Sequence, residues 1–460
     1  MPDLIGMPDL VGSLDVAERL VVIGGDAGGM AAASQARRRR PDLEIVALEL
    51  GRWTSYSACG IPYLVGGGVD RLEELVSRTP EQFRTMRIDV RIDHEATAID
   101  LEARTVEVHS RVHGRSFKLG FDMVHVATGA VPHRPDVPGI DAPHVHGVQT
   151  LGDAAVLLDE VTSRRPRHVC VVGSGYIGLE LAEAFRNRGA DVTVVDQASE
   201  VMGALDPDMG ALVSRGMRSE GITVRLDERL EGIEDGVVTT SAGEIRAELV
   251  VLGTGVAPNT ALAEAAGLPL GPSGGMVVDQ RQATPVDGVY AAGDCCESRH
   301  IVSGRPVHVP LGTHANKQGR VAGINMTGGY ATFPGVAGTA VTRICACEIA
   351  RTGLGEAEAT AAGFEYHVAR IESATQAGYL YDSSAVTVKL LAERGDGRVL
   401  GAQIVGGHGS AKRIDVIATV LAAGMTVEDM VNLDLGYAPP FSPVWDPVIV
   451  AARQAAGQLR

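Results

Sequence analysis

Two copies of one sequence pattern, about 150 residues apart, limit what this chain of 460 residues can fold into. Each copy predicts a buried strand, a glycine-rich turn, a helix and a second strand that ends on an acidic residue. Such a unit binds a dinucleotide, because backbone N–H groups of the turn hold the pyrophosphate and the carboxylate binds a ribose hydroxyl. Two copies in one chain argue against glycine turns without ligands. We therefore predict an α/β protein with two Rossmann-like dinucleotide-binding domains.

The first copy runs from the apolar strand after Arg19 to Glu49. Its turn departs from the usual GxGxxG pattern, because Asp26 replaces the middle glycine, and alone it would be a weak signal. We expect Glu49 to bind the ribose. The turn residues expected to contact the cofactor are Gly24, Gly25, Ala27, Gly28 and Gly29.

The second copy has the complete glycine pattern, between a strand at 168–172 and a strand that ends at Asp196. No arginine follows Asp196 to meet a 2′-phosphate, so the sequence favours NADH, with NADPH left open. The residues expected to contact this nucleotide are Gly173, Gly175, Tyr176, Ile177, Gly178 and Asp196. Turns that close three further strands add the cofactor-binding candidates Ala127, Thr128, Gly129, Gly255 and Asp294.

One cysteine is placed for redox chemistry. Cys59 lies in the segment Ser55–Tyr63, shortly after the strand that ends at Glu49. A reductase with two redox thiols would carry Cys-x4-Cys here, but this segment has no second cysteine. A single thiol has to cycle through a mixed disulfide, a persulfide or a sulfenic acid. The alternative is an inert buried cysteine, since free cysteines are commonly buried.

Composition narrows the class of protein. The formal net charge of −16 argues against a nucleic-acid partner, which requires a basic surface. Six cysteines without regular spacing favour a reducing cytoplasm over a disulfide framework, and we expect no metal site. The sequence has no apolar run of membrane-spanning length and no signal-peptide pattern at its start. Residues 1–17 are expected to be an N-terminal extension.

With these motifs combined, the chain resembles the pyridine nucleotide–disulfide oxidoreductase family over residues 19–455, and within it the coenzyme A-disulfide reductases. The resemblance implies FAD in the first site with Asp294 on the ribitol, and NAD(P)H in the second with Glu180 near the nicotinamide. It also implies a homodimer through a C-terminal α+β domain. The expected domains are FAD-binding (18–125 and 275–334), NAD(P)H-binding (126–274) and dimerisation (335–460).

Local comparisons favour the coenzyme A-disulfide reductase branch. The NADH oxidases and peroxidases of the family carry a histidine where this chain has Ala27. The C-terminal string 434–441 resembles that of the coenzyme A-disulfide reductases, in which a tyrosine of the partner subunit reaches the cysteine and flavin. Tyr437 is the matching residue. Tyr379 is a looser match to a second catalytic tyrosine, and either tyrosine could instead be packed core.

The resemblance also implies positions for coenzyme A. The matching residues are polar or basic, and arginines suit phosphate because a guanidinium donates two parallel hydrogen bonds. Two positions depart from the family pattern, Ala58 in place of an asparagine and Trp445 in place of a lysine. Coenzyme A disulfide is the leading substrate, with persulfides, polysulfides and other small thiols left open. The substrate-binding candidates are Gln35, Arg38, Ser55, Arg87 and Asn316.

The expected chemistry is a hydride transfer from NADH to flavin and electron transfer on to Cys59, held as a mixed disulfide. A thiolate is the attacking form, so we expect the flavin and the helix that starts at Gly60-Ile61-Pro62 to lower the pKa of Cys59. Tyr437 is the candidate proton donor. Two other functions stay open: an NADH oxidase that reduces oxygen, and a non-catalytic flavoprotein that senses NADH.

Overall fold

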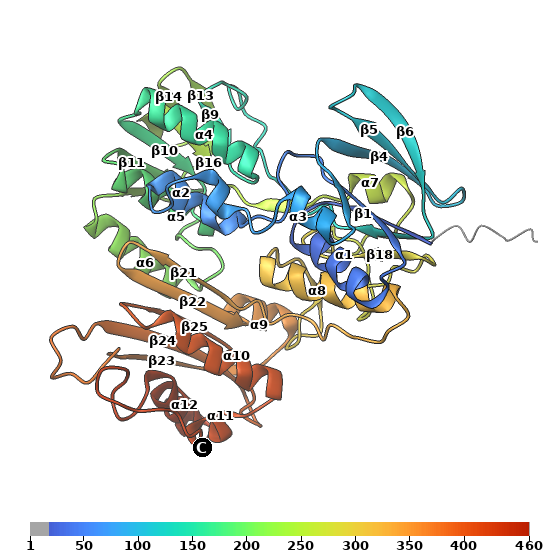
Figure 1. The fold of residues 1–460 in the computed structure, drawn as a ribbon. Coiled ribbons are helices and arrows are strands. Elements are labelled where there is room, and N and C mark those ends of the chain that lie inside the picture. The colour runs from blue at the N-terminus through green and yellow to red at the C-terminus, as the bar shows by residue number, and fades with distance from the viewer. Residues whose placement is uncertain (1–17, 460) are drawn as a thin grey trace, which may run out of the picture.

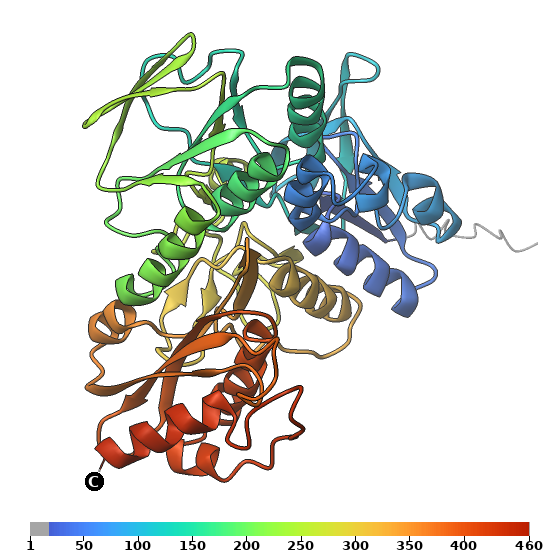
Figure 2. The ribbon, with the colours of Figure 1, turned by 90° about the vertical axis from the view of Figure 1, so that its left-hand side faces the viewer.

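The computed structural model describes residues 18–459, which form three α/β units (Figure 1). The 90° view separates the same units (Figure 2). The extension predicted at 1–17 lies outside the described residues. Within the described part, no helix is both long enough and apolar enough to cross a bilayer.

The first unit is built on a five-stranded parallel sheet of order β18-β7-β1-β2-β3. Because side chains alternate between the faces of a strand, one face of this sheet packs on helices and the other on a three-stranded meander. Its elements are β1 (Arg19–Ile23), α1 (Ala27–Arg39), β2 (Glu44–Leu48), β3 (Asp89–Arg91), β4 (His94–Asp100), β5 (Thr105–Ser110), β6 (Arg115–Gly120), β7 (Met123–Val126), β18 (Val289–Ala291) and α8 (Gly312–Met326).

Helices α1 and α8 lie side by side against the first sheet (Figure 1). Their backbones approach so closely that only glycine fits at the crossing. A Cβ on Gly319 would lie 2.2 Å from the carbonyl oxygen of Gly28, and one on Gly323 would lie 2.5 Å from that of Ala32. The contact fixes α1, and with it the glycine turn that precedes α1.

The second unit repeats this plan. Its five-stranded parallel sheet has the order β12-β11-β10-β16-β9, and a smaller antiparallel sheet, β13-β14-β15, packs against one of its faces. The elements are β9 (Val145–Gly147), α4 (Leu151–Arg164), β10 (His168–Val172), α5 (Tyr176–Asn187), β11 (Asp191–Val195), α6 (Pro207–Ser219), β12 (Thr223–Arg225), β13 (Leu230–Glu234), β14 (Val237–Thr240), β15 (Gly243–Arg246) and β16 (Leu249–Leu252).

Two antiparallel strands connect the first two units. The chain leaves the first unit through β8 (Ala130–Pro132) and returns through β17 (Val256–Pro258), which pairs with β8. After β17, helix α7 (Ala261–Ala265) packs into the core of the first unit. Judged by its packing, the chain has therefore already returned to the first unit before residue 274, where the expected NAD(P)H-binding range ends. The domain ranges given above stay a prediction.

The third unit is an antiparallel sheet of order β21-β22-β25-β24-β23, covered by helices near the C-terminus. Its core is made of alternating apolar residues of β24 and β25 against α10 and α12. The elements are β21 (Ala340–Ile344), β22 (Cys347–Gly353), α9 (Glu356–Ala362), β23 (Tyr366–Ala374), β24 (Ala385–Glu393), β25 (Val399–Gly406), α10 (Ile414–Ala423), α11 (Val427–Val431) and α12 (Pro447–Gln458).

His125 is a titratable residue at the centre of the first sheet. It lies on β7 between Val22 and Tyr290, its side chain is fully buried, and neither ring nitrogen has a hydrogen-bond partner of good geometry among the described residues. Burial lowers its pKa from 6.5 to about 4. Between these values the unfolded chain binds more protons than the folded chain, so the folded state loses stability as the pH falls from 6.5 to about 4.

We expect His125→Leu to remove this part of the acid sensitivity. At 1.36 kcal/mol per pKa unit, the free energy of unfolding of the variant should fall by about 3 kcal/mol less than that of the wild type between pH 7 and pH 4. Urea unfolding at a series of pH values measures the difference. His113→Leu, in an exposed turn, is the control and should leave the pH profile unchanged. Identical profiles for wild type and His125→Leu would contradict the prediction.

Candidate active site

The first glycine turn joins β1 to α1 and presents backbone donors. Gly24 has φ +108°, and a Cβ there would lie 2.0 Å from the carbonyl oxygen of Ala127, so the turn closes tightly against the next strand end. No side chain caps α1, because Asp26 at its N-cap makes no capping hydrogen bond, and the first turn contains no acidic residue. The first N–H groups of a 13-residue helix are thus left for an anionic group such as pyrophosphate.

Glu49 lies beside this turn, as predicted for a ribose-binding carboxylate. It accepts hydrogen bonds from the N–H groups of Gly25 at 2.8 Å and Gly51 at 2.7 Å. Burial raises its pKa, and these two N–H groups oppose the rise.

The second turn repeats this geometry. Gly173 has φ +99°, and a Cβ there would lie 2.3 Å from the carbonyl oxygen of Gly253. Asp196 accepts hydrogen bonds from the N–H groups of Ser174 at 2.7 Å and Ala198 at 2.9 Å. Helix α5 also starts without a capping side chain or an early acidic residue. Each of the two turns therefore offers the donor set and the neighbouring carboxylate that a dinucleotide requires.

The other cofactor candidates lie where the two units meet or at the end of β18. The Thr128 hydroxyl donates to the carbonyl of Asn259 at 2.6 Å, and Gly129 and Gly255 have φ values of +72° and +86° beside the paired strands β8 and β17. Asp294 follows β18 and is half-buried. Burial raises its pKa, an effect that His308 opposes.

Cys59 is held close to the first glycine turn. It lies in a short 3₁₀ turn, Ala58–Gly60, just before α2 (Ile61–Gly66). The segment that leads to it is tied to the turn by three hydrogen bonds: the Thr54 hydroxyl and the Ser55 N–H both donate to the Gly25 carbonyl, and the Tyr56 N–H donates to the Asp26 carboxylate at 3.1 Å. The turn that fits a dinucleotide therefore also positions the thiol.

Asp26 was seen in the sequence only as a departure from the glycine pattern, and its contacts were missed. Burial raises its pKa to about 6, the Tyr56 N–H opposes the rise, and the negative charge of Glu49 adds to it. The only signal in the sequence was an acidic residue at a position where glycine is usual.

The environment of Cys59 differs from the sequence prediction. The thiol reaches the surface of the single chain, but the protein packed around it raises its pKa, and the negative charges of Glu180 and Asp294 raise it further. The expectation of a lowered pKa is thus wrong for the chain by itself. The physical reason is burial of the thiol first and the nearby carboxylates second, which together outweigh the short helix α2.

Beside α2 lies a pocket of about 260 Å³, lined by residues of α2, α5 and β21. The carboxylate of Glu180 lines it and accepts a hydrogen bond from the Thr342 hydroxyl. Burial raises the pKa of Glu180, and the Thr342 hydroxyl opposes this rise. The negative charge of Glu180 acts on Cys59, and the expected place of Glu180 near the nicotinamide stays a prediction. Other lining side chains are Tyr63, Glu183, Asn187 and Arg343.

The substrate candidates fall into two groups: three that lie around α1 and the first glycine turn, and two that contact or belong to α8. Arg38 is exposed at the end of α1, and the neighbouring Arg37 donates a hydrogen bond to the carbonyl of Arg87 at 2.6 Å, so that α1 and the start of β3 adjoin. Ser55 lies next to the glycine turn with φ +51°. Gln35, by contrast, faces Gly323 of α8, and the Asn316 amide bonds within α8 to the carbonyl of Gly312 at 2.9 Å.

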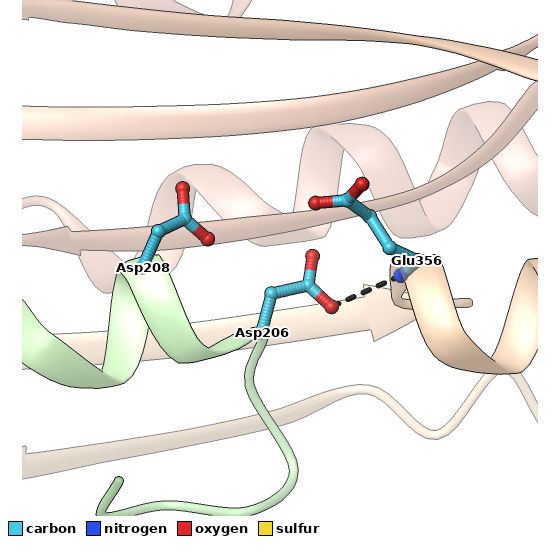
Figure 3. Close-up of side chains that lie close together, drawn as sticks. All are labelled: Asp206, Asp208 and Glu356. Carbon is cyan, nitrogen blue, oxygen red and sulfur yellow. Dashed lines mark hydrogen bonds between the residues drawn. The ribbon is translucent and has the colours of Figure 1, made fainter. Parts of the chain in front are cut away.

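Three carboxylates gather where α6 meets the third unit, and their oxygens lie within 4.8 Å of one another. Figure 3 shows Asp206, Asp208 and Glu356 pointing toward one another, with the Glu356 N–H donating to Asp206. The Lys389 ammonium lies among them, 2.9 Å from Asp206, 2.6 Å from Asp208 and 2.5 Å from Glu356. A buried lysine therefore offsets part of the negative charge of this cluster.

Comparison with known proteins decides the family. Residues 18–319 match the model of the pyridine nucleotide-disulphide oxidoreductases, and residues 339–447 match the model of their dimerisation domain. The chain belongs to the pyridine nucleotide-disulphide oxidoreductase family. The predicted resemblance to the family and to its coenzyme A-disulfide reductase branch is confirmed, as is the fold class.

Individual relatives in this family carry related names. A Pyrococcus horikoshii NAD(P)H coenzyme A polysulfide/persulfide reductase is 37% identical over 446 residues, which cover 95% of this chain and 98% of that protein. An NADH oxidase of Methanocaldococcus jannaschii is 34% identical, with 96% and 99% covered. A solved NAD-dependent persulfide reductase from A. fulgidus has a TM-score of 0.93 at 39% identity, with 96% of this chain and 83% of that chain covered.

Members of the pyridine nucleotide-disulphide oxidoreductase family use FAD and NAD(P)H, and the two glycine turns fit two such dinucleotides. The predicted tyrosines both lie in the dimerisation unit. Tyr437 is 50% exposed and Tyr379 is 76% exposed, so neither is packed core in the single chain. The segment between α11 and α12, which contains Tyr437, is separated from α2 by the sheet of the third unit (Figures 1 and 2). One chain therefore does not bring Tyr437 and Cys59 together.

Proposed function

We propose that this protein is a cytoplasmic, homodimeric FAD-dependent reductase that uses NADH to reduce coenzyme A disulfide, or a related low-molecular-weight disulfide or persulfide, through Cys59. The observation that carries the proposal is the set of hydrogen bonds from Thr54, Ser55 and Tyr56 to the first glycine turn, because it ties the segment that leads to a single thiol to the turn expected to bind FAD. FAD in the first turn and NADH in the second would supply the hydride acceptor and the electron pair.

The residues of the chain carry out the thiol chemistry. The Cys59 thiolate attacks one sulfur of the substrate, forming a mixed disulfide and expelling the other half as a thiolate, which takes up a proton. Two electrons that originate in NADH then cleave the mixed disulfide and restore the Cys59 thiolate, and the second thiol leaves. The sum is RSSR + NADH + H⁺ → 2 RSH + NAD⁺, and a persulfide RSSH yields RSH and H₂S in the same way.

Tyr437 of the partner subunit is the proposed proton donor to the departing thiolate. Its exposure, its position in the dimerisation unit and its distance from α2 of the same chain support a site shared between two subunits. Arg38 and Arg87 would bind the phosphates of coenzyme A; the hydrogen bond from Arg37 to the Arg87 carbonyl supports this by holding the backbone at Arg87 against α1.

The carboxylates around Cys59 oppose the thiolate that this chemistry needs. Glu180 and Asp294 both raise the pKa of Cys59 in the single chain. An oxidised flavin and the partner subunit are the groups absent from this chain that would counter them. The proposal therefore requires both FAD and the dimer for a reactive Cys59.

The test is to isolate the enzyme without added thiol and to measure the mass of the Cys59 peptide, then to compare NADH oxidation with coenzyme A disulfide, with a coenzyme A persulfide and with oxygen alone. We expect a coenzyme A adduct on Cys59 and turnover that depends on the added sulfur substrate. A bare or sulfenic Cys59 together with equal rates in oxygen alone would instead favour the NADH oxidase that the M. jannaschii relative is named for. NADH binding without turnover would favour a sensing flavoprotein.

Asp196 gives a separate prediction about nucleotide choice. Asp196→Ala should lower kcat/KM for NADH roughly ten- to a hundredfold, because a hydrogen bond to a charged group contributes about 1.5–3 kcal/mol. The value of kcat/KM for NADPH should fall less, since the carboxylate that repels its 2′-phosphate is removed. Steady-state kinetics with both nucleotides measures the ratio. Asp191→Ala, at the exposed start of the same strand, is the control, and an unchanged NADH/NADPH ratio in Asp196→Ala would contradict the assignment.

A further inference from the structure

Two segments of the dimerisation unit, 375–384 and 436–446, present large aromatic side chains to the surface. The side chains are half to fully exposed: Tyr379 (76%), Tyr381 (101%), Tyr437 (50%), Phe441 (75%) and Trp445 (50%). Neither segment is a helix or a strand. Exposed loops of this kind need a specific support if a side chain on them is to be held in a reactive geometry.

Arg413 supplies such a support from the protein interior. It lies at the start of α10, and its side chain is only 10% exposed. One guanidinium nitrogen donates both to the carbonyl of Thr375, at 2.8 Å, and to the carbonyl of Phe441, at 2.7 Å. The remaining contacts go to the Gly409 carbonyl and to the Asp446 carboxylate, the latter at 3.0 Å. A single buried side chain therefore joins both aromatic segments to the helix.

Asp446 extends the same network. Besides Arg413, its carboxylate accepts the Ser442 hydroxyl at 3.1 Å and the N–H of Val448 at 3.0 Å, which caps α12. The two segments are also joined directly by the N–H of Ala377, which donates to the carbonyl of Pro439 at 3.0 Å. Segment 436–446, called the Tyr437 loop below, is thus fixed at Pro439, Phe441 and Asp446, all of which follow Tyr437 in the chain, while its aromatic side chains stay exposed.

We infer that Arg413 is a positioning residue for catalysis. It holds the Tyr437 loop in place, and this fixes the position from which Tyr437 donates its proton in the site that contains the partner subunit's Cys59. This inference rests on the proposed function. Arg413 itself is covered by its own loops and acts only through them. Displacing a catalytic group by about 1 Å can cost on the order of a hundredfold in rate, so loss of the guanidinium should show in turnover. A lysine cannot replace it fully, because an ammonium lacks the planar fork whose other two nitrogens donate to the Gly409 carbonyl and the Asp446 carboxylate at the same time.

The test is a double-mutant cycle with Arg413→Gln and Tyr437→Phe, with Arg413→Lys as the conservative variant. Arg394→Gln, an exposed arginine of the same unit with a single ion pair to Glu365, is the matched control. We expect Arg413→Gln to lower kcat with coenzyme A disulfide ten- to a hundredfold, while anaerobic reduction of the bound flavin by NADH keeps its rate. The lysine variant should recover part of the loss. The double variant should be no slower than the slower single variant, because both changes act on one group.

A second readout reports on the loop itself. The chain has two tryptophans, so in a Trp53→Phe background the fluorescence of Trp445 reports on the segment next to Asp446. Acrylamide quenching of Trp445 should increase in Arg413→Gln and less in Arg413→Lys. If the glutamine variant does not fold, the lysine variant carries both measurements.

Separate outcomes overturn the inference and the proposed function. Losses that multiply in the double variant, or unchanged kcat and quenching in Arg413→Gln and Arg413→Lys, overturn the positioning role. A Tyr437→Phe variant with full activity also overturns it, but leaves the reductase in place if turnover still depends on Cys59. Turnover that survives without Cys59 overturns the reductase itself.

Discussion

Cys59→Ser should lower NADH-driven reduction of coenzyme A disulfide by a factor on the order of 10³ or more, with FAD still bound. A serine hydroxyl is far less ionised than a thiol at neutral pH and forms no disulfide, so the mixed disulfide cannot form. FAD binding should persist because the donors of the first turn and the Glu49 carboxylate do not depend on the Cys59 sulfur. Steady-state NADH oxidation and the visible flavin spectrum of the same sample check both halves of the prediction.

Cys347→Ser is the matched control for this change. Cys347 is a half-buried thiol at the start of β22, far in the chain from the glycine turns, and its replacement should leave turnover within about twofold of the wild type. Undiminished disulfide reduction in Cys59→Ser would mean that electrons reach the acceptor without a thiol. Loss of FAD from Cys59→Ser would mean that the segment 54–59 supports the cofactor as well as the substrate.

The cofactor sites could be predicted from sequence because their determinants are local. The turn at Gly24 and the carboxylate of Glu49 belong to one βαβ unit, and the same holds for Gly173 and Asp196. Strand, glycine turn and helix follow one another within a few tens of residues, so their order in the chain already defines their geometry.

The electrostatics of the site could not be predicted in this way. Burial by the surrounding protein and the charges of Glu180 and Asp294 raise the pKa of Cys59, and both carboxylates lie far from Cys59 in sequence. The apparent helix start at Gly60 pointed to a lowered pKa, and the structure reverses the direction. Arg413 was missed for the same reason, because it contacts Thr375 and Phe441 through backbone carbonyls, which leave no residue pattern.

Lys389→Met should cause the largest loss of stability, about 3–5 kcal/mol, because removing the ammonium leaves the buried Asp206 carboxylate unpaired beside two further carboxylates. The Lys389 side chain is 2% exposed and that of Asp206 is 7% exposed, whereas Asp208 and Glu356 are about half-exposed. Burial by itself would lower the pKa of Lys389, but hydrogen bonds to the three carboxylates raise it well above its ordinary value. The ammonium therefore stays charged and joins α6 of the second unit to β24 and α9 of the dimerisation unit.

Denaturant unfolding of wild type and variant measures this loss, and Lys412→Met is its control. Lys412 pairs with Asp415 at the surface, with 76% and 54% of the side chains exposed, so its removal should cost less than about 1 kcal/mol. In Lys389→Met the three carboxylates lose their shared cation and, among the described residues, only Asp208 keeps one, Arg370 at 3.3 Å, so added Ca²⁺ should recover part of the stability because oxygen ligands suit this ion. Asp206→Asn combined with Lys389→Met should also be more stable than Lys389→Met alone, since one of the opposed charges is gone. A loss no larger than that of Lys412→Met would show that the buried ammonium contributes nothing to holding the two units together.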